Sequence, residues 1–364
     1  MTSPTIQPTP PTPRPSQTTL GQKLAERGLL PDVLVRIGIR RLVQQRRTDE
    51  IAVGLEGAER LAFLESLSHG PIAVHTDAAN EQHYEVPALF YQRVLGPNLK
   101  YSSALWPEGV GTLAAAEEAM LALTCERAGL ADGMEILELG CGWGSLSLWM
   151  AGRYPASSIL AVSNSNGQRE FIESTARERG LDNLRVVTSD INDFDAGRRF
   201  DRVVSVEMFE HMRNWDLLLS RVASWLRPDG AAFVHTFCHR QFAYPYEAQS
   251  EDDWMARFFF TGGIMPSMDL ITRFDRDLEV ERQWEVGGLH YAQTCRAWLE
   301  NLDRRRSELM PAFEETYGEG NAAMWIGRWR LFFMACEELF RFDGGREWFV
   351  VHSLLKPRSD DTRT

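Results

Sequence analysis

The sequence predicts an α/β protein with a doubly wound parallel sheet, because short apolar runs alternate with amphipathic segments through its middle. A glycine-rich turn follows the first apolar run and polar residues follow later ones, as expected where parallel strands end. From this pattern we expect strands at 134–139, 158–163, 184–187, 202–206 and 231–236. We expect crossover helices at 145–153, 167–179 and 217–226, the last one stopped by the sequence Arg-Pro-Asp-Gly.

Segments on either side of this sheet complete the predicted domain plan. Residues 1–18 are rich in proline and should form a disordered tail, and residues 19–125 should form an N-terminal helical region. The α/β domain should occupy 126–364, with insertions at about 237–275 and 288–342. In its last part we expect a strand at 278–286, helices near 291–317 and 321–340, and a closing strand at 348–355.

A further helix is predicted over Pro31 to Arg47, where apolar residues repeat at helical spacing and arginines make the other side basic. The simpler interpretation is a solvated helix docked on the main domain, with Val35, Ile39, Leu42 and Val43 as its apolar side. The alternative interpretation is a peripheral contact with an anionic membrane surface.

Composition excludes several classes of protein. Acidic residues outnumber basic ones by 51 to 39, and the formal charge of −12 argues against a nucleic-acid binder that needs a basic surface. The five cysteines are scattered without Cys-x-x-Cys spacing, so we expect no disulfide framework, no metal site and a reducing cytoplasmic setting. No stretch approaches the roughly 18 apolar residues that a membrane helix needs. The protein should therefore be soluble.

The glycine-rich turn is the first candidate for a binding site. A strand that ends in Glu138-Leu139 runs into Gly-x-Gly-x-Gly at 140–144, which brings bare backbone against a ligand. This spacing differs from the Gly-x-Gly-x-x-Gly of dinucleotide sites, and the second strand ends in neutral Ser-Asn-Ser instead of the acid that an NAD ribose requires. Asp190 follows the third strand, where a carboxylate could accept the exocyclic amine of an adenine.

Longer segments of the chain resemble a known family. The sequences Glu-Leu-Gly-Cys-Gly-Trp-Gly at 138–144, Ser-Asn-Ser-Asn-Gly-Gln at 163–168 and Glu-Met-Phe-Glu-His at 207–211 are similar to the cyclopropane fatty acid synthase family of methyltransferases. Within it, the segments at 238–244, 251–254 and 343–348 resemble the coclaurine N-methyltransferase type. The resemblance implies a Rossmann-like class I methyltransferase sheet, with an N-terminal helical lid and a helical insertion before the last strand.

The resemblance also implies that S-adenosylmethionine (SAM) is the cofactor. The cofactor positions that match are Tyr101, Ser102, Gly140, Gly142, Ser165, Gln168 and Asp190, to which we add Glu138 at the end of the first strand. The Tyr-Ser-Ser segment precedes the sheet, so it would have to fold over the cofactor as a lid. Such a cover would keep a reactive methyl sulfonium away from water.

Glu207, Glu210 and His211 are the candidate reaction centre, because they follow the fourth strand at the edge where open α/β sheets bind ligands. Two carboxylates and an imidazole can hold a cationic amine and take its proton before the nitrogen attacks a methyl group. In the N-methyltransferases that the chain resembles, the matching residues serve the amine. The pair Tyr84-Glu85 matches another substrate-side feature of those enzymes.

A competing chemistry is methyl transfer to the double bond of an unsaturated acyl chain. The synthases of the resembled family hold a bicarbonate ion as the base, in residues that match Cys141, Glu210, His235 and Tyr291. Glu207 favours the amine, because the synthases usually carry a small residue there and a carboxylate beside hydrocarbon is costly. We therefore expect N-methylation of a small or amphiphilic amine. Lipid methylation or cyclopropanation is the first alternative, and SAM binding without catalysis is the second.

Overall fold

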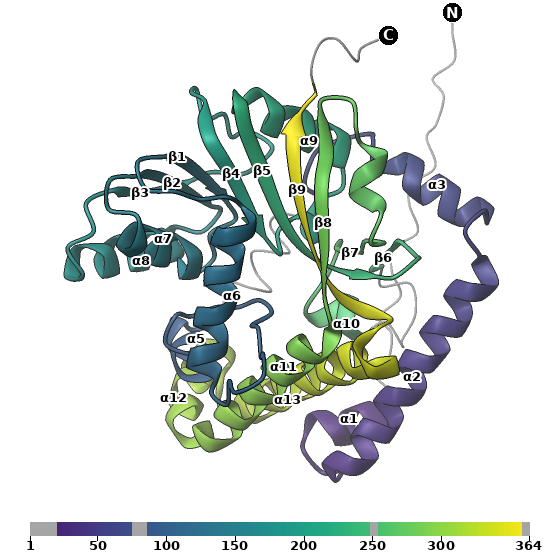
Figure 1. The fold of residues 1–364 in the computed structure, drawn as a ribbon. Coiled ribbons are helices and arrows are strands. Elements are labelled where there is room, and N and C mark those ends of the chain that lie inside the picture. Colours follow the sequence, from purple (N-terminus) through teal and green to yellow (C-terminus); the bar gives the residue numbers. More distant parts are fainter. Residues whose placement is uncertain (1–19, 75–85, 248–253, 359–364) are drawn as a thin grey trace, which may run out of the picture.

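The computed structural model describes residues 20–74, 86–247 and 254–358. Its centre is a seven-stranded sheet in the order β3-β2-β1-β4-β5-β9-β8 (Figure 1). The strands β1 to β5 run parallel, and β9 pairs antiparallel with both β5 and β8. The strand order reverses between β1 and β4, which confirms the predicted doubly wound sheet and places a topological switch point there.

The strands coincide closely with the apolar runs of the sequence. Their bounds are β1 (Glu135–Leu139), β2 (Ser158–Ser163), β3 (Leu184–Thr188), β4 (Phe200–Val206), β5 (Leu226–His239), β8 (Leu278–Val286) and β9 (Trp348–Pro357). A separate two-stranded pair consists of β6 (Tyr244–Pro245) and β7 (Ile264–Met265).

The strand β5 begins earlier than predicted and contains the sequence that was expected only to stop the preceding helix. Phe200 pairs with Leu226 and Arg202 pairs with Ala231, so residues 227–230 bulge out opposite a single residue of β4. The bulge accommodates Pro228, which has no N–H to give to a ladder.

Helices cover both faces of the sheet, as a parallel sheet requires. The helices around it are α6 (Leu113–Arg127), α7 (Ser145–Arg153), α8 (Asn166–Glu178) and α9 (Trp215–Ser224). Ile136 and Ile159 face the core that holds α6 and α7, whereas Leu137 and Leu160, one residue further along, face the core that holds α9. This alternation with a period of two residues assigns each strand side chain to one face.

A second, helical layer lies beyond the carboxyl ends of the parallel strands (Figure 1). It is made of α5 (Ala88–Val94), α10 (Trp254–Phe258), α11 (Gly288–Arg304), α12 (Arg306–Tyr317) and α13 (Glu319–Arg341), with short 3₁₀ turns η1 (Phe209–His211) and η3 (Phe342–Gly345) nearby. A third such turn, η2 (Leu270–Arg273), packs in the core that holds α9. The region predicted as one helix at 291–317 is therefore two helices. The apolar periodicity continues past the break at Arg305, so the pattern alone did not reveal it.

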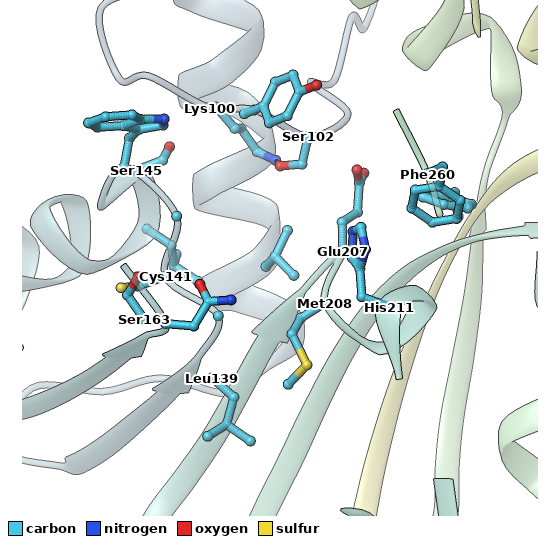
Figure 2. Close-up of a pocket in the computed structure, with 18 of the residues that line it drawn as sticks. Lys100, Ser102, Leu139, Cys141, Ser145, Ser163, Glu207, Met208, His211 and Phe260 are labelled. Atoms are coloured by element: carbon cyan, nitrogen blue, oxygen red, sulfur yellow. Dashed lines mark hydrogen bonds between the residues drawn. The ribbon is translucent and has the colours of Figure 1, made fainter. Parts of the chain in front are cut away.

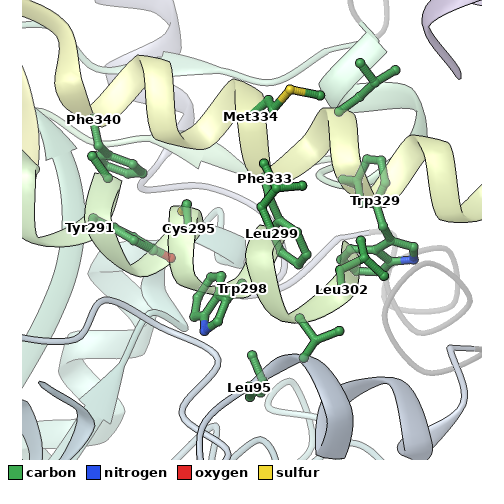
Figure 3. Close-up of a cluster of buried hydrophobic side chains, with 14 of the residues drawn as sticks. Leu95, Tyr291, Cys295, Trp298, Leu299, Leu302, Trp329, Phe333, Met334 and Phe340 are labelled. Carbon is green, nitrogen blue, oxygen red and sulfur yellow. The ribbon is translucent and has the colours of Figure 1, made fainter. Parts of the chain in front are cut away.

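Large buried side chains hold this layer together. Figure 3 shows Trp298 and Leu299 of α11 facing Trp329 and Phe333 of α13, with Leu95 at the edge of the cluster. Trp298, Trp329 and Phe333 are at most 1% exposed. Burial of side chains of this size stabilises the layer by about 2–3 kcal/mol each.

The N-terminal helices are α1 (Leu20–Glu26), α2 (Asp32–Val53) and α3 (Ala58–Ser66). The predicted docking of α2 is found, and three of the four apolar residues expected on its docked side face the protein: Val35 and Val43 are 9% and 8% exposed, and Ile39 packs against the same core. Leu42 is the exception at 57% exposure, and one arginine of the basic side also faces the protein, since Arg36 binds both Glu337 and Glu338 of α13 at 2.7 Å. Arg36 and Arg40 pair with acidic side chains of α13 that would otherwise be buried without a cation. Among the described residues, no helix is long and apolar enough to cross a membrane.

Candidate functional site

A cavity of about 330 Å³ lies between the carboxyl ends of the parallel strands and the helical layer. It is mostly apolar with a few convergent polar groups, which is the usual character of a small-molecule site. The predicted site residues that line it are Tyr101, Ser102, Glu138, Gly140, Cys141, Gly142, Gln168, Asp190, Glu207, His211 and Tyr291. Figure 2 shows Glu207 and His211 entering the cavity from the end of β4, with the glycine turn at Cys141 on another side.

The glycine turn that follows β1 depends on left-handed backbone at each of its three glycines. Gly140, Gly142 and Gly144 have φ of 78°, 52° and 80°. A Cβ on Gly140 would lie 2.8 Å from Cγ of Met208, whereas a Cβ on Gly142 would meet nothing within 4 Å. Gly140 is therefore needed for packing, and Gly142 presents bare backbone to the cavity.

The end of β2 supplies neutral polar groups. Ser163 donates from its hydroxyl to the side-chain oxygen of Gln168 at 2.7 Å, and both residues line the cavity together with Asn164. Ser165 does not line the cavity. Its hydroxyl accepts the backbone N–H of Gln168 at 3.3 Å and so caps the N-terminus of α8.

Glu138 is buried at the floor of the cavity, 2% exposed, and accepts a short hydrogen bond from the hydroxyl of Ser147. Burial raises the pKa of Glu138 to about 7, against a smaller opposite effect of Ser147. Burial also raises the pKa of the neighbouring Cys141 thiol well above its usual range. Cys141 is therefore a neutral thiol and not a nucleophile.

The segment before α6 brings Tyr101 and Ser102 over the cavity, as predicted, and also Lys100, which the sequence did not single out. Lys100 is 3% exposed and donates from Nζ to the hydroxyl of Ser102. Burial lowers the pKa of Lys100 to about 8, although the charges of Glu207 and Glu117 act in the opposite direction. Its position next to the predicted Tyr-Ser-Ser segment was the only available signal.

Glu207 is the most constrained residue of the site. Its φ of 48° is rare for a residue with a side chain and implies local strain of about 1–3 kcal/mol. Oε1 accepts the N–H of Ser103 at 2.9 Å and lies 3.2 Å from Nε2 of His235, and Oε2 accepts the hydroxyl of Tyr291 at 2.6 Å. Burial raises the pKa of Glu207, and Lys100, Ser103 and Tyr291 oppose that rise.

Glu210 and His235 do not line the cavity and lie behind Glu207 and His211. Oε1 of Glu210 accepts the N–H of Phe237 at 2.7 Å, whereas its Oε2 has no hydrogen-bond partner among the described residues. Burial and the charge of Glu207 raise the pKa of Glu210 well above its usual value. The ring of His211 lies 4.7 Å from that of Phe260, edge to face.

The predicted substrate-side pair cannot be placed relative to the cavity. Tyr84 and Glu85 lie outside the described residues. Within the described parts of the chain, no cluster of His, Cys, Asp and Glu could hold a metal ion.

The chain is similar in sequence to proteins of known activity. A family model described as mycolic acid cyclopropane synthetase matches residues 74–346. The (S)-coclaurine N-methyltransferase of Thalictrum flavum subsp. glaucum is 38% identical over 92% of this chain and 95% of its own length. The cyclopropane-fatty-acyl-phospholipid synthase of Escherichia coli (strain K12) is 31% identical over 75% of this chain and 67% of its own.

The fold is similar to a solved structure of the same kind. The crystal structure of a coclaurine N-methyltransferase bound to N-methylheliamine and S-adenosylhomocysteine superposes with a TM-score of 0.87 at 36% sequence identity. The match covers 92% of this chain and 98% of that one, so it includes the sheet and the helical layer together.

Proposed function

This chain belongs to the mycolic acid cyclopropane synthetase family and is a SAM-dependent methyltransferase, and from that premise we propose that it methylates the nitrogen of an amine. The relatives named coclaurine N-methyltransferase support an amine acceptor. The acceptor we propose is a small or amphiphilic secondary amine, because the cavity offers apolar walls around a carboxylate.

The observation that carries this proposal is the buried, preorganised carboxylate of Glu207. A carboxylate in an apolar cavity is costly beside a hydrocarbon chain but favourable beside an ammonium group, with which it forms a charge-assisted hydrogen bond. The strained backbone and three donors hold Glu207 in place before a substrate arrives. This arrangement favours a cationic acceptor over an acyl chain.

The structure supports a division of labour among the three polar residues of the reaction centre. Both oxygens of Glu207 already accept hydrogen bonds, so we assign it the role of anchor for the ammonium group. Glu210 keeps an oxygen without a partner among the described residues, and His211 enters the cavity beside it. We assign His211, which lines the cavity, to receive the proton that the amine must lose, with Glu210 placed behind it as a supporting residue.

The residues around the glycine turn fit SAM. Bare backbone at Gly142, the neutral groups of Ser163 and Gln168, and the carboxylate of Asp190 face one cavity and would hold the methionyl, ribose and adenine parts of the molecule. When bound, SAM supplies a methyl group on a positively charged sulfur. The lone pair of the deprotonated amine forms the new C–N bond, and the electrons of the broken S–C bond remain on sulfur. Tyr101 and Ser102 close the cavity above, which limits the access of water.

Bicarbonate does not fit the residues that were expected to hold it. Tyr291 and His235 both direct their hydrogen bonds to Glu207, so the donors for a bound anion are already engaged. We propose that the reaction runs without bicarbonate, with the proton accepted by the protein itself. A reducing cytoplasmic setting is part of the proposal, since all five cysteines are free thiols.

The test is a competition between acceptor classes. Purified protein and methyl-labelled SAM are incubated with a pool of secondary amines and, separately, with vesicles of monounsaturated phospholipid, with and without added bicarbonate. We expect label in the amine pool at a rate independent of bicarbonate. Label in the acyl chains alone would overturn the proposal, and SAM binding without transfer to either pool would favour a non-catalytic role.

A further inference from the structure

Two residues outside the cavity extend the hydrogen bonding of Glu207 across the sheet. His352 of β9 lies behind His235, with its Nε2 3.0 Å from Nδ1 of His235. Arg127, the last residue of α6, follows on the far side, with its Nη1 2.9 Å from Nδ1 of His352. A chain of hydrogen bonds therefore connects the half-buried guanidinium of Arg127, through the two buried imidazoles, to the carboxylate of Glu207 at the reaction centre.

We propose that Arg127 and His352 are positioning residues that fix the tautomer of His235, so that the N–H at Nε2 of His235 always donates a hydrogen bond to Glu207. The proposal deepens the proposed function and rests on it, since the role assigned to Glu207 is that of an ionised anchor. Neither residue touches the cavity, so both would act only through His235.

The strand register creates the contact between the two rings. His235 and His352 are direct partners in the antiparallel pairing of β5 and β9, and their ring centroids are 4.6 Å apart. Phe233, two residues before His235 on the same face of β5, packs its ring edge-to-face against His352 at 5.1 Å. Both histidines have 0% exposure, so these neighbours limit the rotation of each ring.

The direction of donation follows from the chemistry of arginine. A guanidinium only donates hydrogen bonds, so Nδ1 of His352 must accept. A neutral imidazole carries one N–H, which places the proton of His352 on Nε2, facing His235. Nδ1 of His235 then accepts in turn, and its proton resides on Nε2, 3.2 Å from Oε1 of Glu207. One fixed donor thus sets the tautomers of two rings.

The electrostatic surroundings keep both rings neutral, as this scheme requires. Burial lowers the pKa of His235 and of His352 well below the usual value, and the nearby cations Lys100 and Arg127 act in the same direction. Glu207 is the acidic group that faces His235, with its Oε1 3.2 Å from Nε2 of the ring. Arginine does not release its proton in the working pH range. Arg127 therefore remains a hydrogen-bond donor, and these residues do not carry the proton of the amine away from the reaction centre.

The test compares substitutions that keep or remove the donor at position 127. Arg127→Met keeps the length of the side chain without a donor, and Arg127→Lys restores a cationic donor. Arg282→Met is the matched control: Arg282 lies over the same Trp284 ring as Arg127, at 5.5 Å against 5.1 Å, and no hydrogen bond joins it to either histidine among the described residues. We expect kcat to fall about tenfold in Arg127→Met, to return in Arg127→Lys, and to stay unchanged in Arg282→Met. The affinity for SAM should stay within about threefold throughout.

A spectroscopic readout separates positioning from a merely structural role and does not depend on activity. Histidine labelled with ¹⁵N reports which ring nitrogen carries the proton, and single His→Asn variants assign the signals. We expect both rings to be protonated at Nε2 in the wild type and in Arg127→Lys, and the Nδ1 tautomer to be populated in Arg127→Met. Unchanged tautomers in a folded Arg127→Met variant would overturn the proposal, as would wild-type kcat with altered tautomers. If the wild type methylated no amine, the proposed function would fail. The tautomers would still show whether Arg127 and His352 fix the protonation of His235.

Discussion

Tyr291 of the helical layer donates a 2.6 Å hydrogen bond to Glu207 at the edge of the sheet, and this bond joins the two layers at the reaction centre. The ring of Tyr291 stacks on Phe340 at 4.3 Å, so its hydroxyl is held in one direction. Tyr291 therefore lines the cavity, but its hydroxyl is used to hold Glu207 in position.

Tyr291→Phe should weaken catalysis because it removes one of the donors that hold Glu207. A hydrogen bond to a charged group contributes about 1.5–3 kcal/mol, so we expect kcat to fall roughly 10- to 100-fold. The measurement is methyl transfer from labelled SAM to an amine. Tyr154→Phe, at the end of α7 and outside the cavity lining, serves as the control and should retain full activity. An unchanged rate in Tyr291→Phe would show that the bond does not matter for turnover.

Glu207→Gln should abolish most of the turnover while leaving the cofactor site intact. Loss of the anchor charge should lower kcat/KM for the amine by about 100-fold or more, whereas the Kd for SAM should change by no more than about threefold. Steady-state kinetics and calorimetric SAM binding measure the two effects. Glu118→Gln, an exposed carboxylate bonded to Trp149, is the control. Wild-type turnover in Glu207→Gln would refute the assignment of Glu207.

Lys100→Met should change the pH dependence of the rate. The charge of Lys100 lowers the pKa of Glu207, so its removal should raise that pKa further. Because the anchor acts in its ionised form, the acid limb of the kcat/KM profile should move to higher pH. Lys100→Arg keeps a positive charge and should leave the limb close to its wild-type position. A limb that stays in place in Lys100→Met would mean that Lys100 does not act on Glu207.

Glu138 should make the protein less stable as pH rises through the neutral range. Its pKa is about 7 in the folded protein, against 4.5 as the ordinary value, so between these limits the folded state holds more protons than the unfolded state. Unfolding free energy therefore falls with rising pH across this window, by roughly 3 kcal/mol for this one group. Glu138→Gln should remove that slope. Urea midpoints at pH 5 and pH 8 without SAM measure it, and an equal pH dependence in both proteins would contradict the expectation.

Arg36→Ala should destabilise the fold through the contact between α2 and α13. Arg36 binds Glu337 and Glu338, whose side chains are 1% and 3% exposed, and its removal leaves buried charge with less compensation. Loss of one partner of such a pair costs about 3 kcal/mol. Arg41→Ala, an exposed site on the same helix, should change stability by less than about 0.5 kcal/mol. Equal urea midpoints for the two variants would refute the structural role of Arg36.

The sequence predicted the parts of the molecule that depend on local pattern. The strands β1 to β4 and the glycine turn follow from apolar runs and backbone demands that act within a few residues. Eleven of the predicted site residues also line the cavity, several of them because residues after parallel strands meet at one edge. Glu207 and His211 are examples of that rule.

The remaining features depend on partners that are distant in sequence. The contact of His235 with His352 requires the register of β5 and β9, which no motif specifies. The ion pairs of α2 depend on acidic residues of α13 some 300 positions away, which amphipathic periodicity does not indicate. Lys100 had no recognisable pattern beyond its neighbours.

The helix α13 has two different duties on its opposite sides. Cys336, Leu339 and Phe340 line the cavity, while the intervening Glu337 and Glu338 hold the arginines of α2. A change on the side of α2 that faces α13 should therefore shift the part of the cavity wall that α13 supplies, without touching any group that meets the acceptor. Substitutions at such remote positions should change which amines fit the cavity, while the residues of the reaction centre stay unchanged.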